Sequence, residues 1–96
     1  MTGVRYLTPA VGELESAVDH YEGVSPRIAR AFLDEYLRSL DQLRAFPESA
    51  PMLRQPVRSK VLRKYPYSIL YYLKDDHIVS VMGHKQHPNR WKGRVK

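Results

Sequence analysis

Hydrophobic positions in the N-terminal half of the chain recur at the spacing of α-helices. A short β-forming stretch, Val4–Leu7, precedes Thr8-Pro9, which predicts a helix start with a hydroxyl N-cap and proline at the first helical position. Gly23 is expected to end this helix. Its apolar positions are Ala10, Leu14, Ala17, Val18 and Tyr21. Its acidic positions, expected on the opposite, solvent-facing side, are Glu13, Glu15, Asp19 and Glu22.

A second helix is predicted almost immediately afterwards. Ser25-Pro26 repeats the start signal, and an apolar stripe then runs from Ile28 to Phe46 for about five turns. Phe46-Pro47 ends it. Because the link between the two helices is so short, they are expected to fold back as an antiparallel hairpin. The apolar side of that hairpin requires a sheet or another helix to cover it.

The C-terminal half switches to β-strand chemistry. The stretch Glu48–Pro56 is bounded by prolines and predicts a loop. Three strands are predicted at Val57–Tyr65, Tyr67–Leu73 and His77–Met82, with a turn at Asp75-Asp76. Strands joined by such short links must be antiparallel neighbours. The pattern therefore predicts one α+β domain over residues 1–96, in the order β-α-α-β-β-β, with the helical hairpin packed on one face of a small twisted antiparallel sheet.

Charge is unevenly distributed along the chain, whose net charge is +6. Residues 1–56 hold six Lys/Arg against eight Asp/Glu, which gives −2, and residues 57–96 hold ten against two, which gives +8. A cationic half attracts polyanions, either nucleic acid or an acidic protein partner. A role in solubility alone, without a partner, is the plainer alternative.

Several classes of protein are disfavoured by the composition. No apolar run is long enough to span a bilayer, and the first residues lack the hydrophobic region of a signal peptide. The chain has no cysteine, so neither disulfides nor thiolate zinc sites are expected. His84 and His87 lack nearby carboxylates, so no metal site is expected there either. We expect a cytoplasmic protein with no cofactor and no membrane partner.

Short sequence motifs spread over nearly the whole chain match a known family in order and spacing. They are Leu7-Thr8-Pro9-Ala10, Glu13-Leu14, Ser25-Pro26, Phe32, Phe46-Pro47, Val57-Arg58, the run from Leu62 to Tyr67, Ile69 with Tyr71, Ile78, His84, His87-Pro88, Arg90-Trp91 and Arg94. On these motifs the chain resembles toxins of the RelE/ParE superfamily, from type II toxin–antitoxin (plasmid stabilisation) systems. Arg63-Lys64-Tyr65-Pro66-Tyr67 and the closing His, Pro, Trp and Arg look more like the ParE branch.

The resemblance implies a toxin that arrests growth until a cognate antitoxin, here ParD-like, binds it in a hetero-oligomer. In such pairs a flexible segment of the antitoxin wraps the helical hairpin and the sheet edge. ParE-like members inhibit DNA gyrase, which requires no catalytic residues. RelE-like members cut messenger RNA on the ribosome, which requires cationic groups and a general acid or base around one phosphate.

The residues implied for RNA cleavage are only partly present. RelE-like nucleases place one arginine where this chain has Ser68 and another near Lys85, and a tyrosine near Trp91. Lysine lacks the bidentate fork of arginine, and the indole of tryptophan is a donor only. The remaining catalytic candidates are Arg63, His84, Lys85 and His87. The sequence therefore favours a non-enzymatic gyrase inhibitor, with an mRNA endonuclease as the alternative.

Alternation along the central strand separates core tyrosines from candidate contact residues. Tyr67, Ile69, Tyr71 and Leu73 share one face, expected to lie under the helices. Trp91 is expected either to cap the sheet edge or to anchor a protein partner. The tyrosines beside arginines also allow base stacking as an alternative. The predicted partner-binding residues, expected to share the far side of the sheet, are Arg58, Arg63, Lys64, Tyr65, Tyr72, Arg90, Trp91 and Arg94.

Overall fold

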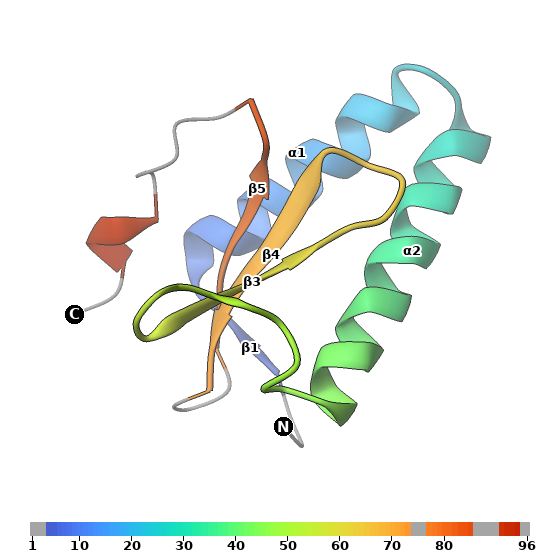
Figure 1. Ribbon diagram of the computed structural model, residues 1–96. Coiled ribbons are helices and arrows are strands. Elements are labelled where there is room, and N and C mark those ends of the chain that lie inside the picture. Colours follow the sequence, from blue (N-terminus) through green and yellow to red (C-terminus); the bar gives the residue numbers. More distant parts are fainter. Residues whose placement is uncertain (1–3, 74–76, 86–90, 95–96) are drawn as a thin grey trace.

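The computed structural model describes residues 4–73, 77–85 and 91–94. Its elements follow the predicted β-α-α-β-β-β order, with one additional strand and a short 3₁₀ helix (Figure 1). They are β1 (Arg5–Tyr6), α1 (Thr8–Glu22), α2 (Pro26–Ala45), β2 (Met52–Arg54), β3 (Val57–Val61), β4 (Tyr67–Tyr72), β5 (His77–Gly83) and η2 (Lys92–Arg94). The predicted α+β fold class is confirmed.

The strands form one five-stranded sheet in the order β1-β5-β4-β3-β2. The antiparallel pairing of β3 with β4 and of β4 with β5 is as predicted. The sheet as a whole is mixed, because β1 lies parallel to β5. The two strands are separated in sequence by the helical hairpin and the other strands, which gives the long connection that parallel neighbours require. The prediction of a purely antiparallel sheet is corrected in this respect.

The structure differs from the predicted element boundaries in two places, both near β2 and β3. The stretch Glu48–Pro56, predicted as a loop, contains β2, an edge strand whose three residues are all exposed. Strand β3 ends at Val61 rather than Tyr65, and residues 62–66 form the connection to β4. Short, exposed edge strands of this kind carry little sequence signal because they bury no side chains.

The starts of the two helices differ in how they are capped. Ser25 caps α2 as predicted, since its Oγ accepts a hydrogen bond from the Ile28 amide at 3.1 Å. Helix α1 begins at Thr8, with Leu7 in the N-cap position and no side-chain cap, so the predicted Thr8 cap is wrong. The Leu7 amide donates to the Ile78 carbonyl at 3.0 Å. The helix therefore begins directly where the sheet ends.

The main core lies between the helices and one face of the sheet (Figure 1). Ile69 and Tyr71 are fully buried there, and Tyr67 and Leu73 pack against the same cluster, which confirms the predicted alternation of β4. Not all of the predicted stripe of α2 is buried. Phe46 is 69% exposed, because the helix ends at Ala45 and residue 46 leaves the helical path.

A second, smaller core covers the opposite face of the sheet. Val57, Leu70 and Val79 are buried together with Trp91, which is 4% exposed. Of the two alternatives for Trp91, this burial favours the structural cap, which lies over the sheet face rather than its edge. Burial on both faces explains why β4 has no polar side in the sequence.

Glu13 was expected in solvent but is buried, at 7% exposure. Its Oε1 accepts hydrogen bonds from Ser80 Oγ at 2.9 Å and from Arg94 Nη1 at 2.7 Å. A second guanidinium nitrogen of Arg94 lies 3.3 Å from Oε2, and Nη1 also donates to the Val79 carbonyl at 3.1 Å. The pair joins the first helix to β5 and to η2. The carboxylate of Glu13 is therefore a buried structural group that connects α1 to the sheet.

Candidate functional site

Four of the predicted site candidates, three Lys or Arg residues and one histidine, lie at one end of the molecule. Arg63 and Lys64 are exposed in the β3–β4 connection, and His84 and Lys85 are exposed directly after β5. The two segments are joined by the His84 amide, which donates to the Pro66 carbonyl at 2.8 Å. We call residues 62–66 and 83–85 the basic end.

The shape of the basic end is fixed from α2 by a buried carboxylate. Glu35 is 6% exposed, and its Oε2 accepts a hydrogen bond from the Lys64 amide at 3.0 Å. Tyr65 contributes from the other side of the connection. Its ring lies 5.2 Å, centroid to centroid, from both Tyr21 and Phe32. The connection is thereby held against the helices while the side chains of Arg63 and Lys64 remain in solvent.

The other predicted contact residues have internal contacts or lie elsewhere. Arg58 Nη1 donates to the carbonyls of Glu48 at 3.1 Å and Ala50 at 2.8 Å, so this guanidinium holds the α2–β2 connection. Tyr72 is half-buried and stacks on His77. Tyr65, Trp91 and Arg94 are engaged in the packing described above. His87 and Arg90 lie outside the described residues.

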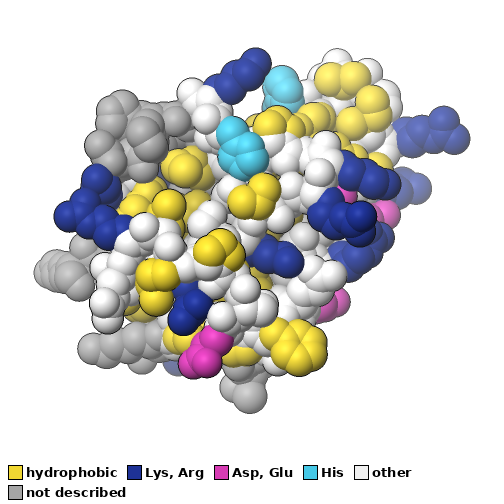
Figure 2. Space-filling model, in the orientation of Figure 1, with side chains coloured by type: hydrophobic (Ala, Val, Ile, Leu, Met, Phe, Trp, Pro, Cys, Tyr) yellow, Lys and Arg dark blue, Asp and Glu magenta, His cyan; other side chains and the backbone are white. Residues whose placement is uncertain are grey.

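The predicted cationic contact residues therefore differ in their surroundings: Arg63 and Lys64 are exposed, whereas Arg58 and Arg94 have internal partners. Figure 2 views the molecule from the side away from α1 and shows Lys and Arg side chains spread over most of this face. Hydrophobic side chains lie between them, and few acidic side chains are visible. Figure 2 thus shows positive charge on the face away from α1, and the two segments of the basic end are in backbone contact.

Ser68 occupies the position at which the resemblance implies an arginine in nucleases. It is 4% exposed, and its Oγ lies 2.9 Å from His84 Nε2. A hydroxyl this buried is not accessible to a substrate as a nucleophile. The Ser68 hydroxyl instead orients the imidazole of His84. The next residue along the chain from His84 is the cation Lys85.

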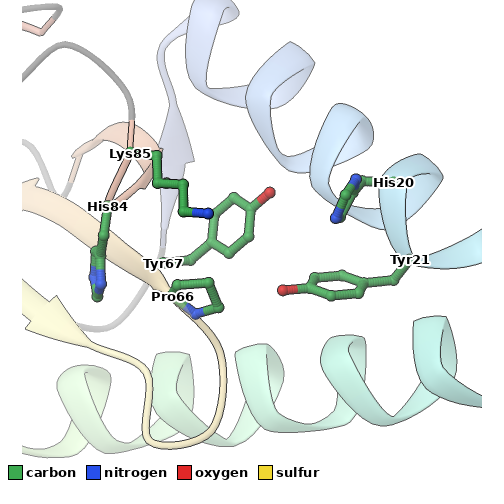
Figure 3. Close-up of a pocket in the computed structure, with 7 residues that line it drawn as sticks. His20, Tyr21, Pro66, Tyr67, His84 and Lys85 are labelled. Atoms are coloured by element: carbon green, nitrogen blue, oxygen red, sulfur yellow. The ribbon is translucent and has the colours of Figure 1, made fainter. Parts of the chain in front are cut away.

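A pocket of about 250 Å³ lies beside the basic end, between α1 and the start of β4 (Figure 3). It is lined by His20, Tyr21, Pro66, Tyr67, Gly83, His84 and Lys85. In Figure 3 the side chain of Lys85 extends toward the Tyr67 ring, and the hydroxyl of Tyr21 points toward Pro66. The ring of His84 points away from the others. No carboxylate is among the lining residues.

His20 and Tyr21 were missed as site residues by the sequence analysis. Both lie in the last turns of α1, far in sequence from the strands that complete the pocket. Burial, and then the neighbouring Tyr67 and Tyr65, raise the pKa of Tyr21 above its ordinary value. Its phenol is therefore a neutral hydrogen-bond donor at physiological pH.

Neither metal ligation nor a membrane-spanning helix is found in the described part of the chain. Among residues 4–73, 77–85 and 91–94, no group of three or more His, Asp or Glu side chains is placed to hold a metal ion. None of the helices in these residues combines the length and the apolar character needed to cross a bilayer.

Comparison with solved structures defines the fold class of the chain. No protein-family profile matches the sequence. No curated protein matches it either. A helical hairpin on a small mixed sheet is the RelE/ParE-like arrangement, and a solved structure shares it. A chain of a chromosomal ParDE TA system from P. aeruginosa matches with a TM-score of 0.72 and 20% sequence identity, over 86% of this chain and 96% of that chain. The RelE/ParE-like fold is thus confirmed.

Proposed function

We propose that this protein is the toxin of a type II toxin–antitoxin pair, that it inhibits DNA gyrase by direct contact, and that a ParD-like antitoxin neutralises it. The observation that carries the proposal is the shared fold with a chain of a ParDE system, which extends over 86% of this chain. The sequence motifs that resemble the ParE branch support it separately, since they were identified from residues alone.

The basic end is the surface that we assign to the target. Arg63, Lys64 and Lys85 project from backbone that Glu35 and Pro66 hold in place. A rigid, cationic surface of this kind favours rapid encounter with an acidic partner and requires no catalytic group. The buried hydroxyl of Ser68 in place of an arginine also favours inhibition by contact over cleavage.

The antitoxin is expected on the other side of the molecule. Strand β2 is an exposed edge of the sheet. Leu37 of α2 is 47% exposed, and Phe46, which follows the helix, is 69% exposed. An exposed sheet edge next to apolar side chains suits a disordered acidic segment that folds on binding.

The decisive experiment measures gyrase supercoiling with purified toxin. We expect a concentration-dependent block that the neighbouring antitoxin reverses. The double variant Arg63→Ala/Lys64→Ala should weaken the block about tenfold or more, because two unpaired surface cations are removed from the contact. The matched control is Lys92→Ala, which removes an exposed lysine of η2 and should leave the block unchanged. Normal supercoiling at saturating toxin would exclude the gyrase proposal.

The alternative, a ribosome-dependent mRNA endonuclease, is favoured by one observation. The His84 ring is oriented by Ser68, and His84 is next to Lys85 in the sequence, so a proton-transfer group and a cation lie on neighbouring residues. On this alternative, toeprinting on translating ribosomes shows A-site cuts that His84→Ala or Arg63→Ala abolishes. Absence of cuts with the unmodified chain would eliminate it.

A further inference from the structure

We propose that the pocket between the end of α1 and the basic end binds a nucleoside phosphate. In this arrangement the phosphate lies at Lys85, and the nucleoside lies against Tyr21, Tyr67 and Pro66. The inference goes beyond the proposed function, because it concerns a small ligand and does not require that gyrase be the target.

The polar groups of the pocket are suited to an anion. Lys85 supplies a positive charge, and His20 and the two phenols supply ring N–H and O–H groups. The Tyr21 phenol is neutral at pH 7, because its pKa, raised by burial, lies above the ordinary value of 10.0, so this hydroxyl can donate. Hydrogen bonds from an ammonium group to phosphate are stronger than those between neutral groups. Among the described residues that line the pocket, none is a carboxylate that would repel the ligand.

The size and the apolar surface of the pocket favour a nucleotide over an acidic side chain. About 250 Å³ is slightly below the range of roughly 300–1,000 Å³ occupied by drug-sized ligands. One nucleotide is therefore about the largest ligand that the pocket can accommodate. A carboxylate side chain would reach only the polar groups, whereas a nucleoside can also contact the parts of Tyr21 and Tyr67 that line the pocket and are not packed against each other and Phe32. Aromatic rings of this kind stack well on nucleobases, whichever base is present.

The pocket shares His84 and Lys85 with the candidates for RNA cleavage, but it also includes residues of α1 and lies on the helical face of β4. Tyr67 faces the helices, whereas the next residue, Ser68, has its side chain on the opposite face of β4 with the imidazole of His84. Figure 3 shows that imidazole pointing away from Lys85 and His20. Binding in the pocket therefore involves His20 and Tyr21 of α1, which are not among the candidate residues for RNA cleavage.

Titrations followed by NMR of the ¹⁵N-labelled chain test the proposal. The probes are adenosine 5′-monophosphate, adenosine, inorganic phosphate and a 5′-phosphorylated trinucleotide. We expect saturable shifts of pocket amides with adenosine 5′-monophosphate at millimolar concentration or below, roughly the affinity of one nucleotide. Adenosine and phosphate alone should bind more weakly. A trinucleotide that binds more tightly than the mononucleotide identifies a nucleic-acid strand as the source, and equal affinities identify a free nucleotide.

Matched variants separate binding in the pocket from attraction to the general positive charge. Lys85→Ala should weaken the mononucleotide about tenfold, and Lys92→Ala, outside the pocket, by less than about twofold. Both lysines are exposed, so neither change is expected to affect folding. Lack of saturable shifts with both nucleotides, or equal losses in the two variants, would overturn the proposal. Because the readout is direct binding, such a result leaves the supercoiling experiment to decide the gyrase proposal by itself.

Discussion

The buried ion pair between Glu13 and Arg94 makes a quantitative prediction about stability. Removing one partner of a buried pair costs about 3–5 kcal/mol, since the remaining charge is left without compensation. Here Ser80 Oγ and the Val81 amide still donate to Glu13, and the Arg94 side chain is 15% exposed. We therefore expect Arg94→Ala to lower the free energy of unfolding by about 2–4 kcal/mol.

Urea and thermal denaturation followed by circular dichroism measure this change. In a domain of this size, about 2–4 kcal/mol corresponds to a decrease in Tm of roughly 10–25 °C. The double variant Glu13→Gln/Arg94→Ala should lose less stability than the sum of the single variants, with a coupling of about 1 kcal/mol or more. Lys92→Ala on the same 3₁₀ helix is the control and should change stability by less than about 0.5 kcal/mol. If Arg94→Ala costs no more than this control, the pair behaves as a solvent-exposed one and the reasoning is refuted.

Three further predictions concern other buried groups. Trp91→Ala should lower the free energy of unfolding by about 3–5 kcal/mol. In the unmodified protein the tryptophan fluorescence should be blue-shifted and poorly quenched by iodide, and strong quenching would contradict burial. Glu35→Ala should lower the free energy of unfolding by about 1–3 kcal/mol and speed hydrogen exchange of the Lys64 amide. Glu35→Gln keeps an acceptor and should largely preserve the stability and the slow exchange. Equal exchange rates in the two variants would argue against the contact. Burial, followed by the Coulombic effect and hydrogen bond of Tyr6, raises the pKa of Tyr36 above 10.0, so the stability that its neutral phenol contributes is present below pH 10 and decreases as pH rises further. Tyr36→Phe should make this loss at high pH shallower in urea denaturation, and an unchanged slope would count against the buried phenol.

The sequence predicts the elements that have strong periodic signals. Helix α2 was recovered almost to the residue, because Ser25-Pro26 and Phe46-Pro47 mark both ends. The face of β4 that packs under the helices was likewise predicted from the alternation of Ile69 and Tyr71. In each case the signal is local, within one element.

The features that sequence reasoning missed depend on contacts between distant segments. A helical repeat assigns Glu13 to the acidic side of α1, but only the folded chain brings Arg94, 81 positions later, to its carboxylate. The pocket is similar, since His20 and Lys85 come from opposite ends of the chain. The parallel alignment of β1 with β5 could not be predicted either, because two residues carry no periodicity that reveals a partner.

The pairing of β1 with β5 also has a consequence for biosynthesis. Strand β1 leaves the ribosome well before its partner Ile78 and before Arg94, the partner of Glu13. A nascent chain can form the helical hairpin early, but its sheet stays incomplete until β5 has been synthesised. Co-translational folding can therefore complete the sheet and the Glu13–Arg94 pair only after Arg94 has left the ribosome, and a chain truncated before β5 lacks both closing contacts.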